Sequence, residues 1–206
     1  MSEHGIIFAI ANSRVIVSRI FGVAILLLLL FTGHSFAQGT ITDILFELSG
    51  LFLLSICSLG RLWSLMYISG NKRRELVTEG PYSIVRHPLY LFSLIGAFGI
   101  GLASENLLVL ILIIVFYLLY YPFTILAEER KMTNKFGDAY REYMKKTPRF
   151  IPKFSLYKEP ELYEVKAASF VRNFVDGMWF IWIFMLLHFV EMLQDSGYLR
   201  VFLRIP

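Results

Sequence analysis

The sequence predicts an all-α protein, a polytopic membrane bundle of about five transmembrane helices that forms one domain over residues 1–206. Hydrophobic residues make up 56% of the chain and charged residues only 17%, and the mean hydropathy is +0.60. A soluble chain of this length cannot bury so much apolar surface. The apolar residues also fall in separate runs, with Lys and Arg concentrated in only some of the intervening loops. These observations argue against a soluble enzyme, a disordered chain and a disulfide scaffold.

Each predicted span is a run of mostly apolar residues, of which about 20 cross a bilayer as a helix. The first run also has features of a cleaved signal peptide, because Ser35-Phe36-Ala37 follows it like a cleavage site. The third run is short, at about 24 Å of helix. The fifth is weaker, and lying at the membrane surface is the alternative to spanning. The five runs are residues 15–32, 42–67, 89–104, 107–127 and 174–193.

The loops between these runs alternate in basic content. Residues 33–41 and the two-residue turn 105–106 carry no Lys or Arg, whereas residues 69–88 carry four and residues 128–154 carry eight. The positive-inside rule therefore predicts that both basic segments and the N-terminus are cytoplasmic. The net charge of +4 is explained by this orientation signal, so we expect membrane lipids and no nucleic acid as partners.

The first polar segment, residues 76–90, contains the turn signal Gly80-Pro81 and then Arg86-His87-Pro88. Pro88 is well placed as the first residue of the third span. Arg86 and His87 would then lie beside free backbone N–H groups, where an anion can bind. The alternatives are a membrane-phosphate anchor for Arg86 and a capping or core position for His87.

The second polar segment, residues 128–143, is predicted to be an amphipathic helix on the membrane surface. Glu128 and Glu129 come directly after the apolar fourth run, and carboxylates at that depth are costly unless they are hydrated or paired. A bound cation would also relieve their conflict with the helix dipole. The alternative is a solvated helix end. The Pro148–Pro152 region cannot be helical throughout and is expected to fold back as a lid over the first segment.

Other chemistries lack their motifs. The four histidines are scattered and Cys57 is the only cysteine, so we expect no metal site. Walker and Rossmann glycine motifs and a serine nucleophile elbow are also absent from the sequence.

The two polar segments resemble the isoprenylcysteine carboxyl methyltransferase and phospholipid methyltransferase family of integral-membrane enzymes. The resemblance covers residues 60–153, the predicted motif core, and rests on these matches: Gly80-Pro81-Tyr82, Arg86-His87-Pro88-Leu89-Tyr90, Glu128-Glu129, Phe136-Gly137, Tyr140, Tyr143, Pro148 and Pro152. It implies methyl transfer from S-adenosylmethionine in a cytoplasmic pocket, with a lipophilic acceptor entering from the bilayer. The implied cofactor-binding residues are Arg74, Glu75, Leu76, Val77, Tyr82, His87, Pro88, Leu89, Tyr90 and Glu129.

The physical chemistry of these residue types agrees with that implication. A carboxylate such as Glu129 suits the ammonium of the cofactor, and tyrosine faces suit its sulfonium. The tight hairpin between the third and fourth runs would bring His87 and Glu129 to the same side of the membrane. The sequence identifies no catalytic residue and leaves open whether a side chain acts as general base.

One position departs from the prenylcysteine enzymes, in which an arginine four residues before the second glutamate is tied to the substrate carboxylate. Here that position is Ile125. An apolar residue there predicts an acceptor that is neutral at this point. Glu128 and Arg86 are the other candidate substrate-binding residues.

Two other functions compete with a methyltransferase. Membrane sterol-type reductases, which use NADPH, share a similar His-Pro region, and Lys135-Phe136-Gly137 resembles their Lys-Tyr-Gly. A membrane protein that has kept the fold without enzymatic activity is the third possibility. Cofactor binding and turnover discriminate the three.

Overall fold

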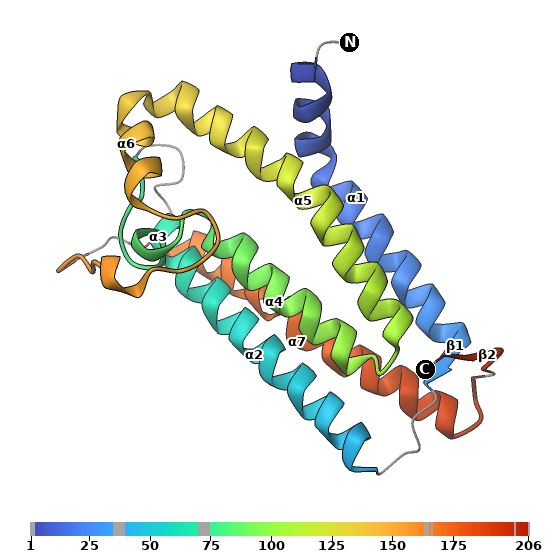
Figure 1. Ribbon diagram of the computed structural model, residues 1–206. Coiled ribbons are helices and arrows are strands. Elements are labelled where there is room, and N and C mark those ends of the chain that lie inside the picture. Colours follow the sequence, from blue (N-terminus) through green and yellow to red (C-terminus); the bar gives the residue numbers. More distant parts are fainter. Residues whose placement is uncertain are drawn as a thin grey trace.

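The computed structural model describes residues 3–34, 40–69, 75–162, 165, 167–199 and 201–205. Over these ranges the chain is mainly helical (Figure 1). The elements are α1 (Glu3–Phe31), β1 (Thr32–His34), α2 (Ile41–Ile68), α3 (Pro81–Ile84), α4 (Pro88–Ala103), α5 (Leu107–Phe136), α6 (Asp138–Lys146), a 3-10 turn (Phe154–Leu156), α7 (Ala167–Asp195) and β2 (Leu203–Ile205).

The predicted membrane bundle is confirmed. Three stretches are long and apolar enough to cross a bilayer: α2, α5 and Phe170–Gln194 of α7. Two shorter apolar helices, Ile16–Phe31 and Pro88–Ala103, accompany them. All five predicted runs therefore lie in apolar helices. The predicted fifth run is the central part of α7.

Helix α4 lies at the centre, packed against α2, α5 and α7, while α1 packs along α5 (Figure 1). Glycines permit the close approach of α2 and α4. A Cβ on Gly60 would lie 2.2 Å from the Phe92 ring, and one on Gly50 would lie 2.7 Å from the backbone nitrogen of Ala103. An apolar core cluster joins α1, α5 and α7 through Ile25, Leu29, Val109, Ile113 and Leu187.

One end of the bundle, which we call the turn end, holds the short turn between α4 and α5. Asn106 caps α5 there by accepting a hydrogen bond from the Val109 amide at 3.2 Å. Beside it, β1 and β2 pair in parallel with Thr32 opposite Leu203. The side-chain amide of Gln194 in α7 donates to the carbonyl of Leu29 at 2.8 Å. These contacts tie α7 to the C-terminal end of α1.

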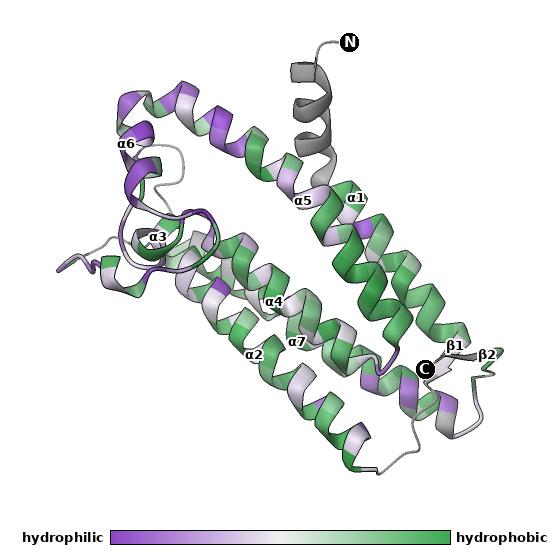
Figure 2. Ribbon diagram, viewed as in Figure 1, coloured by the Kyte–Doolittle hydropathy of each residue, from purple (hydrophilic) through white to green (hydrophobic). Residues whose placement is uncertain are grey.

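The opposite end, the motif end, consists of α3, α6 and the chain around them. Here the predicted surface helix over residues 128–143 is wrong in its boundaries. Helix α5 continues as one helix to Phe136, and its colour changes from hydrophobic to hydrophilic toward α6 (Figure 2). Gly137 then adopts a φ of +56°, which favours glycine, and this residue separates α5 from α6. Within α6 the expected apolar face is present, because Tyr140 and Tyr143 are buried.

Residues 147–158, which we call the strap, fold back over α3 as an extended segment. The Arg86 amide donates to the Pro148 carbonyl at 2.8 Å, and the Lys153 amide donates to the Ile84 carbonyl at 3.0 Å. Farther along, the Gly80 amide donates to the Lys158 carbonyl at 2.7 Å. The strap is therefore fixed by backbone hydrogen bonds to the first polar segment.

Candidate active site at the motif end

The hairpin of α4 and α5 brings His87 and Glu129 together although they are 42 positions apart in the sequence. His87 precedes α4, Glu129 lies near the end of α5, and His87 Nε2 is 3.1 Å from Glu129 Oε1. Both side chains are buried, with residue exposures of 6% each. A buried carboxylate needs charged or hydrogen-bonding partners, so the site is built around satisfying Glu129.

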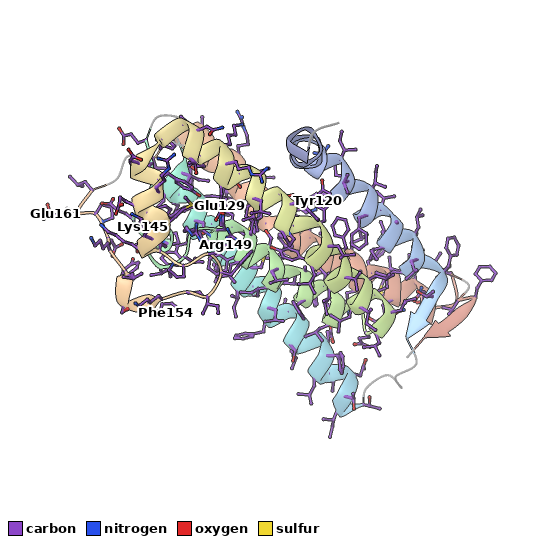
Figure 3. All side chains as sticks on the ribbon, turned by 45° about the horizontal axis from the view of Figure 1, so that its top comes forward. Tyr120, Glu129, Lys145, Arg149, Phe154 and Glu161 are labelled. Atoms are coloured by element: carbon purple, nitrogen blue, oxygen red, sulfur yellow. The ribbon has the colours of Figure 1, made fainter. Side chains whose placement is uncertain are left out.

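Two arginines complete this group. Arg86 Nη1 lies 3.0 Å from Glu129 Oε1, and Arg149 of the strap contacts both oxygens, with Nη2 at 2.5 Å and Nε at 3.1 Å. Figure 3 shows Glu129 and Arg149 next to each other at this end of the molecule. We call Arg86, His87, Glu129 and Arg149 the Glu129 cluster. Two guanidinium groups face one carboxylate, so the cluster has an excess of hydrogen-bond donors and of positive charge.

Aromatic side chains border the Glu129 cluster on its membrane side. The Tyr90 hydroxyl donates to Glu128 Oε2 at 2.7 Å, and the rings of His87 and Tyr90 are 5.8 Å apart. Tyr117 donates to the Tyr90 carbonyl at 2.5 Å and stacks on Tyr121, with ring centroids 4.0 Å apart. The face of an aromatic ring attracts cations, so a cluster of tyrosines is suited to lie beside a positively charged group.

Tyr82 links this region to α6, because its carbonyl accepts a 2.7 Å hydrogen bond from the Tyr143 hydroxyl. Burial, and then the nearby Glu128 charge, raise the pKa of Tyr82 well above its ordinary value. Burial also raises the pKa of Tyr143. Both phenols therefore stay neutral at physiological pH, and the Tyr143 hydroxyl serves as a hydrogen-bond donor.

The other residues predicted from the sequence are more dispersed. Pro88 is the buried first residue of α4, and the Leu89 carbonyl accepts a hydrogen bond from Ser93. Leu76 and Val77 are partly buried and Glu75 is exposed. Ile125 lies one helical turn before Glu129 and is only 1% exposed. Arg74 lies outside the described residues, and the binding roles of all these residues stay predictions.

The start of α4 differs from expectation. Pro88 has no N–H, and the amides of Tyr90 and Leu91 donate to the His87 carbonyl at 3.1 and 3.0 Å. Few backbone donors are therefore available to an anion there. Arg86 points to Glu129 instead of to a membrane phosphate, and the His87 side chain makes no capping hydrogen bond.

Two contributors to the site are not predicted from the sequence. Arg149 belongs there only to the proline segment, and Tyr117 only to an apolar run. The separation of Arg149 from Glu129 carries no helical periodicity, because Gly137 reverses the chain between them. The position of Arg149 between two prolines, in a segment expected to fold back, was the available signal.

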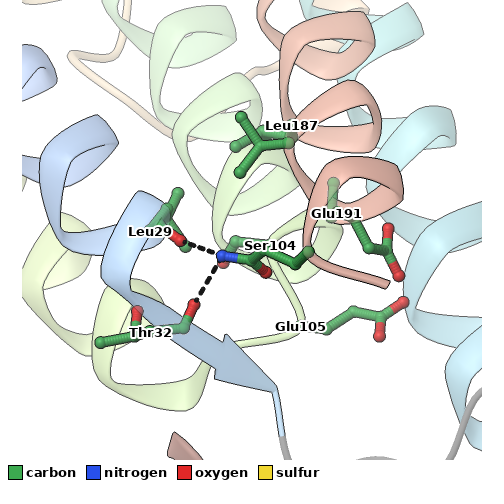
Figure 4. A pocket seen from close by; sticks show the side chains of 9 residues that line it. Leu29, Thr32, Ser104, Glu105, Leu187 and Glu191 are labelled. Carbon is green, nitrogen blue, oxygen red and sulfur yellow. Dashed lines mark hydrogen bonds between the residues drawn. The ribbon is translucent and has the colours of Figure 1, made fainter. Parts of the chain in front are cut away.

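A second group of charged residues lies at the turn end. Carboxylate oxygens of Asp43, Glu105 and Glu191 lie within 4.8 Å of one another, a grouping able to hold a metal ion. Figure 4 shows Glu105 and Glu191 facing each other at a pocket between α1, α7 and the α4–α5 turn. No metal site was expected from the sequence. This group is at the opposite end of the bundle from the Glu129 cluster.

The helices that form the site match a known sequence family. The model of the phospholipid methyltransferase family matches residues 40–139, which include His87 and Glu129. The chain belongs to this family. It is 37% identical over 191 residues to the cobalt-zinc-cadmium resistance protein CzcN of Cupriavidus metallidurans, covering 93% of this chain and 88% of that protein. No solved structure matches the chain.

Two further relatives extend this assignment. The nickel-cobalt-cadmium resistance protein NccN of Alcaligenes xylosoxydans xylosoxydans is 34% identical, covering 89% of this chain and 86% of that protein. The protein-S-isoprenylcysteine O-methyltransferase of Schizosaccharomyces pombe is 37% identical over 82 residues, 40% of this chain and 35% of the enzyme. The chain is therefore a membrane protein of a methyltransferase family.

Proposed function

We propose that this protein is an S-adenosylmethionine-dependent methyltransferase that acts on a lipophilic small molecule or lipid. The observation that carries the proposal is the Glu129 cluster, a buried carboxylate with two guanidinium groups at 2.5–3.1 Å. The amino-acid end of S-adenosylmethionine carries one ammonium and one carboxylate, so it matches a site with one acid and an excess of basic groups. When bound, this cofactor supplies an electrophilic methyl group.

The residues of the site have distinct proposed tasks. Glu129 binds the ammonium of the cofactor. Arg86 and Arg149 bind its carboxylate, and these new contacts replace part of the contacts that the two arginines make with Glu129. The aromatic rings of Tyr90 and Tyr121 face the sulfonium. Methyl transfer removes the sulfonium charge, so a site that excludes water favours the reaction, and alignment of the acceptor is the main contribution of the protein.

The acceptor and the cofactor are proposed to arrive by different routes. Lys and Arg concentrate in the segments at the motif end, which supports a cytoplasmic location of this end by the positive-inside rule. The polar cofactor then enters from water beside the strap, where Arg149 has a side-chain exposure of 43%. A lipophilic acceptor enters from the bilayer between the helices.

Calorimetry on the detergent-purified protein tests the proposal. We expect S-adenosylmethionine to bind to the wild type and Glu129→Ala to reduce the affinity at least a hundredfold. Glu142→Ala is the matched control, because Glu142 is an exposed α6 carboxylate that pairs with Lys145. Binding of NADPH in place of S-adenosylmethionine would instead establish the reductase alternative. Cofactor binding without methylation of any component of a lipid extract would favour a non-enzymatic protein.

We also infer a contribution to metal tolerance, because the two relatives that match along most of the chain are resistance proteins. The names describe resistance to metals and leave the reaction open, so a methyltransferase that modifies membrane components is compatible with them. A strain that lacks this protein is expected to become more sensitive to cobalt, zinc or cadmium. Wild type should restore growth and Glu129→Ala should not. Equal rescue by both would separate tolerance from the active site.

A further inference from the structure

Arg61 is a positively charged residue in an otherwise apolar part of α2. It lies seven residues before the helix ends at Ile68, or about 10 Å along the helix axis. Ionisable side chains inside membrane helices are costly, and those that occur usually mark a binding site or a pathway. Arg61 is not part of the Glu129 cluster.

The contacts of Arg61 leave its charge without a counter-ion in the described part of the chain. Arg61 Nη1 donates to Ser93 Oγ in α4 at 2.6 Å, and its guanidinium carbon lies 5.5 Å from the centre of the Phe180 ring in α7. Its Nε is buried and has no hydrogen-bond partner. Among the ion pairs formed by described residues, none includes Arg61. A buried donor of this kind is expensive unless a ligand completes it.

Arg61 is also close to the proposed methyl-transfer site. Its hydrogen-bond partner, Ser93, lies three residues after Tyr90, whose hydroxyl contacts Glu128. Burial and the Glu128 charge raise the pKa of Tyr82, and the Arg61 charge acts on the same phenol in the opposite direction. The charges of Arg61 and Glu128 therefore both act on the Tyr82 phenol. One helix, α4, separates the two charges.

We propose that Arg61 binds an anionic group of the lipophilic acceptor, so that the substrate class is an apolar chain bearing a carboxylate or a phosphate. A guanidinium recognises both groups through paired N–H donors. The acceptor is then neutral where it passes Ile125 in α5 and negatively charged where it meets α2. This inference rests on the proposed methyltransferase function, because it assigns the anion to the methyl acceptor.

Lipid binding measured by native mass spectrometry tests the proposal without relying on turnover. The probes are two pairs with matched tails: dioleoylphosphatidic acid with dioleoylglycerol, and oleate with oleyl alcohol. We expect the wild type to retain at least one anionic probe tenfold more than its neutral counterpart, and the pair that responds distinguishes phosphate from carboxylate. Arg61→Gln should reduce this preference to within twofold, and Arg61→Lys should preserve most of it.

Controls separate this inference from the proposed function. Arg141→Gln removes an exposed α6 arginine that pairs with Asp138, and should keep the preference. Arg61→Gln should leave S-adenosylmethionine affinity within twofold of wild type, whereas loss of cofactor binding would show a merely structural role and overturn the inference. An unchanged lipid preference in Arg61→Gln would also overturn it. If the wild type binds no S-adenosylmethionine, the proposed function fails first.

A competition experiment tests whether the bound anion occupies the acceptor site. Oleate and dioleoylphosphatidic acid have no nucleophile other than the oxygens that Arg61 would bind, so they serve as competitors and not as methyl acceptors. The preferred anionic probe should inhibit methyl transfer from labelled S-adenosylmethionine to a lipid extract by the wild type, and Arg61→Gln should raise the concentration for half-inhibition at least tenfold. If the probe binds through Arg61 and leaves methyl transfer unchanged, the assignment to the acceptor is overturned and Arg61 holds a structural lipid instead.

Discussion

The two ends of the bundle arrange their charged side chains in opposite ways. At the motif end, three basic side chains surround one buried carboxylate, Glu129, at 2.5–3.1 Å. At the turn end, three carboxylates lie within 4.8 Å of one another around the α4–α5 turn. The first arrangement combines opposite charges, whereas the second brings like charges together. In both, the side chains come from segments distant in sequence.

This difference shows that buried charge alone does not identify which end of the bundle carries the candidate active site. The motif end has complementary groups, aromatic faces and a strap that covers them, all within or next to the family's matched residues. The turn end is held by other forces, namely the Gln194 hydrogen bond, the β1–β2 pairing and glycine packing. We therefore expect substitutions in the Glu129 cluster to change both stability and cofactor binding, and substitutions at the turn end to change stability alone.

The largest effect is expected from Glu129→Ala on stability. Removing one member of a buried ionic group leaves its partners uncompensated, which costs about 3–5 kcal/mol. Arg86 and His87 would be left buried without the carboxylate that both contact. Thermal unfolding in detergent should show a clear decrease in Tm, while Glu142→Ala should change it little. Equal Tm values for Glu129→Ala and wild type would show that the cluster does not stabilise the motif end.

Ile125→Arg probes the acceptor side of the same end. Farnesylcysteine analogues should be poor acceptors for the wild type, and Ile125→Arg should improve them several-fold in a methyl-transfer assay. Because Ile125 is 1% exposed, the variant also buries a new charge, and we expect it to lose about 2–3 kcal/mol of stability. Ile125→Met is the control for size. Efficient methylation of farnesylcysteine by the wild type would contradict our interpretation of Ile125.

Gly50→Ala tests whether the turn end is structural. The new methyl would lie 2.7 Å from the Ala103 nitrogen and 2.9 Å from its Cα, and backbone yields less easily than a side chain. We expect a loss of about 1–3 kcal/mol with unchanged S-adenosylmethionine affinity. Gly22→Ala is the matched control, since nothing lies within 4 Å of its added Cβ. A large loss of cofactor affinity in Gly50→Ala would show that the two ends are coupled.

Glu105→Gln should give the smallest effect, and with the opposite sign to Glu129→Ala. It removes one of three like charges, whose mutual repulsion at about 4 Å is of order 1 kcal/mol in water. Thermal unfolding is expected to show a Tm equal to or slightly above that of wild type, with unchanged cofactor binding. A marked decrease in Tm would mean that the Glu105 charge itself stabilises the turn.

Much of the fold was predictable because its main determinant is local. Runs of apolar residues become membrane helices whatever they pack against, so all five runs lie in apolar helices. The boundary between α5 and α6 was not predictable in this way. Residues 128–136 have the polarity of a surface helix, but helix propagation carries α5 through them until Gly137 allows a φ of +56°.

The candidate site was predictable where one hairpin determines it. The two-residue turn after α4 places His87 opposite Glu129, and the family resemblance pointed to both. Arg149 and Arg61 depend on how separate segments dock, and no periodicity of the sequence encodes that docking. The prediction of free amides at the start of α4 was wrong for a local reason, because the His87 carbonyl accepts hydrogen bonds from two of these amides.

The contacts between the end of α1 and the C-terminal residues have a consequence for biogenesis. Gln194 binds the Leu29 carbonyl across 165 positions, and β1 pairs with β2 beyond it. The Gln194 contact cannot form before residue 194 has been synthesised, and the strand pairing cannot form before residues 203–205 follow. The backbone edge of β1 therefore stays without its partner strand until β2 has been synthesised. A ribosome stalled before β2 would hold a bundle whose motif end is assembled and whose opposite end is still open.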